Sequence, residues 1–269
     1  MDWARAKNIM IILLFALNLM LTGTIVSRAF GGGADRELYA SVTRILNERG
    51  VTMMCGFPKK VTSSDLLIYS DGARFVELCA KALSGGYASR VERLGRESLR
   101  YTNPRPEENL NMSSMSALDN AIHQNLENRG VSLSGFTTDY STKSSDGNYF
   151  FQYILDYKGK LVFDSNISVT VNREGGITEI TISYRDIKDV SLDKIMKVIP
   201  AYQVILKNYY ENGSTIISIN IGFMGQNMAR DNPFVESEEG AVWRVRLDDG
   251  TERFFEATYG DEIYLYSKS

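Results

Sequence analysis

The chain has 269 residues, of which 43% are hydrophobic, and its formal net charge is −3 at pH 7. This apolar fraction is typical of a globular protein and excludes an intrinsically disordered chain. The basic residues are scattered along the sequence instead of forming a cluster. Their distribution argues against a nucleic-acid-binding protein, so no nucleic-acid partner is expected.

The amino terminus is a short charged segment followed by a long apolar run. No charged residue occurs from Asn8 to Val26. A helix of that length, at about 1.5 Å per residue, approaches the roughly 30 Å hydrocarbon core of a bilayer. Arg5 and Lys7 precede the run. The positive-inside rule therefore predicts a cytoplasmic segment and an extracytoplasmic main part. The predicted divisions are a cytoplasmic segment 1–7, a transmembrane helix 8–26 in contact with membrane lipid, and a linker 27–34.

A cleaved signal peptide is the alternative reading of the same segment. The most apolar part, from Ile9 to Leu21, is short enough for a signal-peptide core. Ser27 and Ala29 are small residues at the two positions that a signal peptidase reads. Cleavage would release the protein, whereas retention would tether it to the outer face of the membrane.

Asn18 is a polar residue in the middle of the apolar run. An asparagine in lipid is stabilised by a hydrogen bond, which a neighbouring helix can supply. Residues three and four apart share one face of a helix. The predicted partner-binding face therefore consists of Ile11, Leu14, Asn18, Leu21, Thr22 and Ile25. The alternative is that Asn18 bonds a carbonyl one turn earlier in its own helix.

The outer part is predicted to be α+β, with two tandem domains of antiparallel sheet and packed helices at 35–105 and 106–269. Apolar periodicity predicts helices over 35–48, from Asp71, and around 115–126. The segments TRILNERGVTM (43–53) and HQNLENRGVSL (123–133) align without a gap. Each reads as a helix end, a glycine and the start of an extended segment, which supports two units that each begin with a helix.

Strands dominate from Gly147 onward, with turns predicted at Lys158-Gly159, at 174–176 and at Asp249-Gly250. The segment SLDKIMKVIPAYQVILKNYY (191–210) has helical periodicity interrupted by Pro200. It predicts a short helix before the proline and a second helix that starts at it. The carboxylates of ESEEG (236–240) do not match a calcium-binding loop and predict a solvated turn.

The search for reactive chemistry yields little. His123 is the single histidine, and no hydrolase, metalloprotease or nucleotide-binding motif accompanies it. We therefore expect no catalytic, cofactor or metal site, and we read His123 as an ordinary polar residue of a helix. Cys55 and Cys79 lie in the exported part, where they could pair. Two separate buried thiols are the alternative.

Several segments together resemble the YycI regulatory proteins. They are MDW at 1–3 with Lys7 and LNLML at 17–21, IPAYQVILKNYY at 199–210, IGFMG at 221–225, and AVWRVRLDDGTERFFEA at 241–257. The resemblance implies a single-pass membrane protein of Gram-positive bacteria with two α+β domains outside the membrane. It implies a sensor histidine kinase and a YycH-like companion protein as partners. It also implies retention of the leading helix, and it implies no catalysis.

The resulting hypothesis is a membrane-anchored regulatory subunit that modulates the sensor kinase of a two-component system controlling cell-wall metabolism. The contact is expected mainly through transmembrane helices. The alternative is an exported sheet-and-helix binding module, acting as a peptidase inhibitor or ligand-binding protein, which the final hairpin DDGTERFFEATYGDEI also resembles. A wall-active hydrolase is the least favoured class, because no catalytic constellation is evident in the sequence.

Overall fold

The computed structural model describes residues 33–85, 89–209, 213–225 and 237–264, together with Leu14, Leu17, Asn18 and Met20. The described helices are α2 (Gly33–Glu48), α3 (Ala73–Leu83), α4 (Met115–Asn128) and α5 (Ala201–Asn208). Strands make up most of the remainder, so the predicted α+β class is confirmed. No helix among these residues is both long enough and apolar enough to cross a bilayer, and the predicted span 8–26 lies mostly outside them.

The strands form one large sheet and one small sheet. In chain order they are β1 (Thr52–Met53), β2 (Ser63–Ser70), β3 (Arg90–Arg93), β4 (Ser98–Thr102), β5 (Phe136–Lys143), β6 (Tyr149–Tyr157), β7 (Lys160–Val171), β8 (Ile177–Ser183), β9 (Asp186–Lys197), β10 (Thr215–Phe223), β11 (Ser237–Glu239), β12 (Ala241–Leu247), β13 (Glu252–Glu256) and β14 (Glu262–Ile263). The large sheet has eleven strands, and the small one has the order β11-β2-β9.

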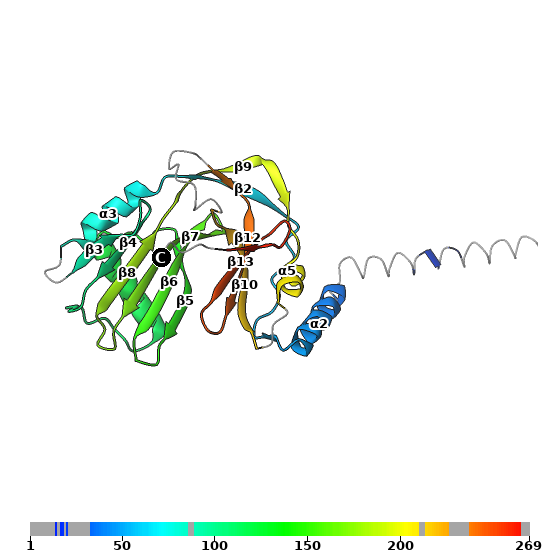
Figure 1. Ribbon diagram of the computed structural model, residues 1–269, viewed down its shortest axis with the longest axis horizontal. Helices are drawn as coiled ribbons and strands as arrows, with labels where there is room; N and C mark the ends of the chain where they lie inside the picture. The colour runs from blue at the N-terminus through cyan, green and yellow to red at the C-terminus, as the bar shows by residue number, and fades with distance from the viewer. Residues whose placement is uncertain are drawn as a thin grey trace, which may run out of the picture.

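Strand β7 joins two halves of the large sheet. Its residues Leu161 and Val162 pair with β10, whereas residues 166–171 pair with β8. We call β3–β8 the first half-sheet, and β1, β10 and β12–β14 the second half-sheet. Figure 1 shows the two halves side by side, with β5 and β10 facing each other. Because β10 pairs in parallel with both β1 and β7, the sheet is mixed, and the expectation of a purely antiparallel sheet was wrong.

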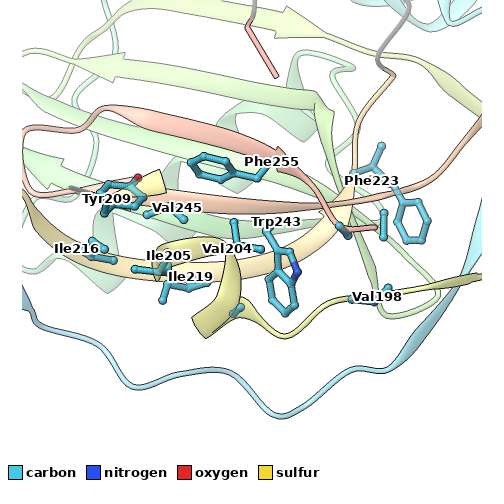
Figure 2. Packing of buried hydrophobic residues seen from close by; sticks show 14 of the residues in the cluster. Val198, Val204, Ile205, Tyr209, Ile216, Ile219, Phe223, Trp243, Val245 and Phe255 are labelled. Carbon is cyan, nitrogen blue, oxygen red and sulfur yellow. The ribbon is translucent and has the colours of Figure 1, made fainter. Parts of the chain in front are cut away.

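Each half-sheet has its own apolar core. In the first, α3 and α4 pack on the strands through Val76, Leu118 and Ile122, which meet Leu99 and Ile180. In the second, α2 and α5 cover the strands, with Leu46 and Val204 among the buried side chains. Figure 2 shows Val204 and Ile205 of α5 lying against Trp243, Val245 and Phe255 of the sheet.

Both cores contain residues from either side of residue 105. The first core combines Val76 and Leu99 with Leu118, and the second combines Leu46 with Trp243. The division into 35–105 and 106–269 therefore stays a prediction about folding units. The buried apolar side chains group by half-sheet and not by this division. Each half-sheet core contains residues from distant parts of the chain.

The matching segments around residues 50 and 130 fold in the same way. At the end of α2, the Val51 amide donates to the Leu46 carbonyl at 2.9 Å, and at the end of α4 the Val131 amide donates to Leu126 at 2.9 Å. The intervening glycines have positive φ angles, 76° at Gly50 and 86° at Gly130. A glycine in this left-handed conformation ends a helix without steric cost. After Gly50 the chain enters β1 at once, whereas after Gly130 it reaches β5 through a further turn.

Two local predictions were wrong. The residues before Pro200 form the long strand β9, because they pair with β2 over most of its length; the helix α5 does begin directly after the proline. ESEEG was predicted to be a solvated turn, but residues 237–239 form β11, and Glu239 is 3% exposed. Strand β5 was not anticipated, since its sequence FTTDYSTK contains few apolar residues.

The end of α4 provides a direct test of the backbone argument. A Cβ at position 130 would approach no atom closer than 3.6 Å, so Gly130→Ala meets backbone strain without a steric clash. We expect it to lower the free energy of unfolding by about 1–2 kcal/mol. Gly56→Ala is the matched control, because Gly56 has no neighbour within 4 Å and no left-handed φ. Urea unfolding of the two variants makes the comparison, and equal stabilities would contradict the argument.

Candidate functional site

A half-open cleft of about 410 Å³ lies between the two half-sheets. Residues 137–140 of β5 form one wall, and Ile217, Ser218 and Asn220 of β10 form the other, with Arg246 of β12 between them. Ile154 of β6 and Leu161 of β7 complete the lining. We refer to it below as the β5–β10 cleft.

Four charged side chains beside the cleft form a closed cluster. The two guanidinium nitrogens of Arg244 contact the Asp139 carboxylate at 2.6 and 2.8 Å. Arg246 donates to Asp139 at 2.5 Å and, through Nε, to Glu252 at 2.9 Å. Arg244 is 1% exposed and Arg246 is 3% exposed. The two arginines and the Asp139 side chain are removed from water together, whereas the Glu252 side chain is 23% exposed. Direct pairing of this kind is the condition under which buried charge is tolerated.

Strand alternation explains why arginines lie inside this protein. Trp243 and Val245 point into the core under α5, so Arg244 and Arg246 point to the opposite face, toward β5. Aromatic rings cover the guanidinium groups there. The Arg244 carbon Cζ lies 4.5 Å from the ring centre of Phe163, and that of Arg246 lies 4.6 Å from Tyr140. Such cation–π contacts strengthen when water is excluded.

The cluster changes the acidity of its members. Burial by itself would raise the pKa of Asp139, but the hydrogen bonds and charges of Arg244 and Arg246 outweigh burial, so this pKa lies below its ordinary value. Burial would lower the pKa of Arg246, and Asp139 and Glu252 raise it instead. Asp139 and Arg246 therefore each favour the charged form of the other.

A second polar cluster lies where β7 passes from one half-sheet to the other. The Asp164 side chain is fully buried and accepts a hydrogen bond from the Gly225 amide at 2.9 Å. The Arg185 guanidinium lies 3.6 Å from Asp164 and 3.5 Å from Glu97. The Ser165 hydroxyl and the Arg185 backbone exchange two hydrogen bonds, at 3.0 and 3.1 Å. These contacts join β7 to the connection between β8 and β9.

Asp164 is the carboxylate with the most perturbed surroundings among the described residues. Burial raises its pKa to about 6, although the Gly225 amide and the Arg185 charge act in the opposite direction. The buried carboxylate of Glu239 on β11 raises it further. Tyr69 of β2 completes the surroundings, and burial raises the pKa of its phenol well above its usual range.

The predicted partner-binding face is described in two positions only. Leu14 is helical and 56% exposed. The Asn18 amide donates to the Leu14 carbonyl at 2.9 Å, which is the intrahelical bond named above as the alternative. Ile11, Leu21, Thr22 and Ile25 lie outside the described residues. The partner-binding role of this face stays a prediction.

The other residues singled out from the sequence lie apart from both charge clusters. The His123 ring packs edge-on against Tyr153, with ring centres 4.9 Å apart. Cys55 is half-buried and Cys79 is buried, and both are free thiols. The alternative of two separate thiols therefore holds in this structure.

Sequence reasoning missed Asp139, Arg244, Arg246 and Glu252. A signal was present in VWRVRL, where two arginines alternate with apolar residues within a strand that has the composition of a buried one. Asp139 could not be paired with them in advance, because about a hundred residues separate it from both arginines.

In both charge clusters the charged side chains pair with one another, and they link strands that are distant in the chain. The clusters therefore have a structural role, and the fold serves as a scaffold for contacts with other molecules. Comparison with protein families then identifies the family of this protein. The family model of the YycI protein matches residues 36–258, so the chain belongs to the YycI family. Its members are regulatory accessory proteins of the YycG/WalK two-component system, which confirms the resemblance noted in the sequence.

Other comparisons add little. The comparison with curated protein sequences found no match. Among solved structures, the Bacillus megaterium YpeB C-terminal domain is similar over 74% of this chain and 97% of that chain, with 12% sequence identity and a TM-score of 0.36. A likeness of this size does not bear on function.

The raised pKa of Asp164 predicts a pH dependence of stability. Because the folded-state pKa of about 6 lies above the ordinary 3.8, the folded protein gains stability from protonation at low pH and loses it as the pH rises through 6. The loss amounts to about 3 kcal/mol between about pH 4 and about pH 7. Asp164→Asn removes this titration, so its unfolding free energy should fall less steeply over that range.

The measurement is the slope of unfolding free energy against pH, from urea titrations of both proteins. Asp248→Asn, at an exposed carboxylate of the last hairpin, should keep the wild-type slope. Parallel profiles for wild type and Asp164→Asn would show that Asp164 does not titrate in this range.

Proposed function

We propose that this protein is a membrane-anchored regulatory subunit that modulates a sensor histidine kinase controlling cell-wall metabolism. In this proposal residues 8–26 remain as a transmembrane helix, residues 1–7 are cytoplasmic, and the bulk of the chain lies outside the membrane. Membership of the YycI family carries the proposal, because regulation of such a kinase is the role of that family.

The anchor acts through direct contact with the kinase's own transmembrane helices. Leu14, Leu17 and Met20 are helical and more than half exposed, which suits side chains that face lipid or another helix. Between helices in lipid there is little hydrophobic gain, so close packing and polar groups supply the association. The contact face comprises Ile11, Leu14, Asn18, Leu21, Thr22 and Ile25.

A regulatory subunit can bias a kinase only by binding one of its signalling states more tightly than the other. The outer half-sheets adjust that bias, and a YycH-like companion protein shares the task. The competing proposal is a released binding module that inhibits a peptidase. The two differ in the fate of the amino terminus.

The first test is therefore the mature protein itself. Retention of Asp2 and Trp3 is expected, together with association with membranes after a high-salt wash, because a helical anchor is not displaced by salt. Amino-terminal sequencing of protein from both membranes and medium makes the measurement. Recovery of most of the protein from the medium, with Phe30 as its first residue, would favour the released module.

The second test addresses Asn18. Asn18→Leu should weaken association with the kinase about fivefold, because a polar group between helices in lipid contributes roughly 1 kcal/mol. Membrane insertion should be unchanged or improved. Energy transfer between labelled full-length proteins in bilayers reports the affinity.

Leu13→Ile, a conservative change on another face of the predicted helix, is the control and should bind as wild type. If Asn18→Leu also binds as wild type, the asparagine serves only its intrahelical bond to Leu14. Binding that disappears on deletion of the outer region alone would place the contact outside the membrane.

A further inference from the structure

The segment between β1 and β2 exposes an apolar side chain near two lysines. Met54 is 72% exposed, although its backbone amide donates to the Ile216 carbonyl at 2.9 Å and is thereby held in place. Lys59 and Lys60 are exposed, and neither forms an ion pair with a carboxylate of the described residues. No acidic residue occurs in 49–64. This surface therefore combines an exposed methionine with unpaired positive charge.

Aromatic rings hold this segment against two helices. The Phe57 ring stacks on Tyr39 of α2 with ring centres 5.2 Å apart, and Tyr39 lies 6.1 Å from Tyr202 of α5. All three residues are half-buried. Figure 1 shows α2 and α5 next to each other at one end of the molecule. We refer to residues 54–60 below as the Met54 loop, which these contacts place beside α2.

The chain length between the predicted anchor and α2 limits how far this loop can lie from a membrane. The predicted span ends at residue 26 and α2 begins at Gly33, so residues 27–32 connect them. These six residues reach at most about 20 Å when fully extended. Tyr39 lies six residues into α2, roughly 9 Å along the helix axis. The Met54 loop, which contacts Tyr39, is therefore within reach of the lipid headgroups.

The composition of the Met54 loop matches a membrane surface better than a protein surface. Segments that lie in a membrane interface insert apolar side chains at the acyl boundary and place basic side chains on anionic headgroups. Met54, Lys59 and Lys60 supply both kinds of group. A stable protein interface buries about 800 Å² on each partner. One exposed methionine beside the half-buried Phe57 and Pro58 offers much less apolar area than that.

We propose that the Met54 loop docks on the membrane that holds the anchor, with Met54 at the acyl boundary and Lys59 and Lys60 on anionic phospholipid headgroups. The inference rests on the anchor of the proposed function. A single tether leaves the outer part free to rotate on the membrane. A second attachment fixes the orientation of the second half-sheet relative to a kinase in the same bilayer.

Tryptophan fluorescence of the full-length protein in bilayer discs tests this proposal. Met54→Trp is introduced into a Trp3→Phe background, so that the remaining native tryptophan is Trp243, which is 1% exposed and gives a constant signal. In discs of anionic phospholipid, the added tryptophan should emit at shorter wavelength. Lipid brominated near the headgroup should quench it. The quenching should be weaker in discs of zwitterionic lipid.

Matched variants locate the effect. Leu78 is also an exposed apolar residue, at 56%, but it lies on α3 of the first half-sheet, so Leu78→Trp should emit equally with and without bromine. Lys59→Gln together with Lys60→Gln should lower the docking constant about fivefold for each lysine. Lys143→Gln together with Lys158→Gln, at exposed positions of the first half-sheet, should leave the quenching unchanged.

The outcomes separate this inference from the proposed function. If the anchored protein shows no quenching at Met54→Trp, or equal quenching at Leu78→Trp, the inference fails and the proposed function stands. A shorter emission wavelength without quenching would indicate a protein on the loop, such as a second copy, and would also overturn the inference. Quenching that ignores both the lysine changes and the lipid charge would contradict docking on anionic headgroups. If the wild-type protein is not retained in the discs, the proposed anchor fails, and the inference fails with it.

Discussion

The contact between Asp139 on β5 and the two buried arginines of β12 is the interaction on which the arrangement of the half-sheets depends. It joins residues about a hundred positions apart and pairs the charges of two buried arginines with Asp139 and the partly exposed Glu252. Loss of one member of such a buried set typically costs about 3–5 kcal/mol, because its partners stay buried and unpaired. Asp164, Ser165 and Arg185 add a second polar connection where β7 crosses between the halves. The apolar cores stabilise each half, and these polar contacts join the halves together with the β7–β10 pairing and an apolar cluster of Ile154, Phe163, Val242 and Phe254.

This construction suits a regulatory protein. Helices cover one face of each half-sheet, and the β5–β10 cleft between the halves is lined by both polar and apolar side chains. The helix α2 belongs to the second half-sheet and directly follows the predicted linker and anchor. Under the proposed function, a change in this half-sheet has a short covalent route to the predicted transmembrane helix.

The parts of the fold that could be predicted from the sequence are those that local interactions determine. Two turns and two helix ends contain residues in the left-handed conformation, and their residue types predicted them. They are the turns at Lys158-Gly159 and Asp249-Gly250 and the helix ends at Gly50 and Gly130. Strand β9 was mistaken for a helix because pairing with β2 overrides its local preference. Strand β5 and its Asp139 gave no apolar signal, since β5 is a polar edge strand stabilised by distant arginines. The membrane face around Asn18 was proposed from spacing alone, and partner contacts cannot be derived from one chain.

The most direct test of this account compares unfolding in the two half-sheets. In a Trp3→Phe background, the fluorescence of Trp243 reports the second half-sheet, and amide exchange of β4 and β8 reports the first. With Asp139 in place, both probes should show one urea transition with the same midpoint. Asp139→Ala should lower both midpoints together or separate them, because the two buried arginines lose their shared partner. Two well-separated transitions in the protein with Asp139 intact, or no effect of Asp139→Ala on either midpoint, would contradict the claim that this contact holds the halves as one unit.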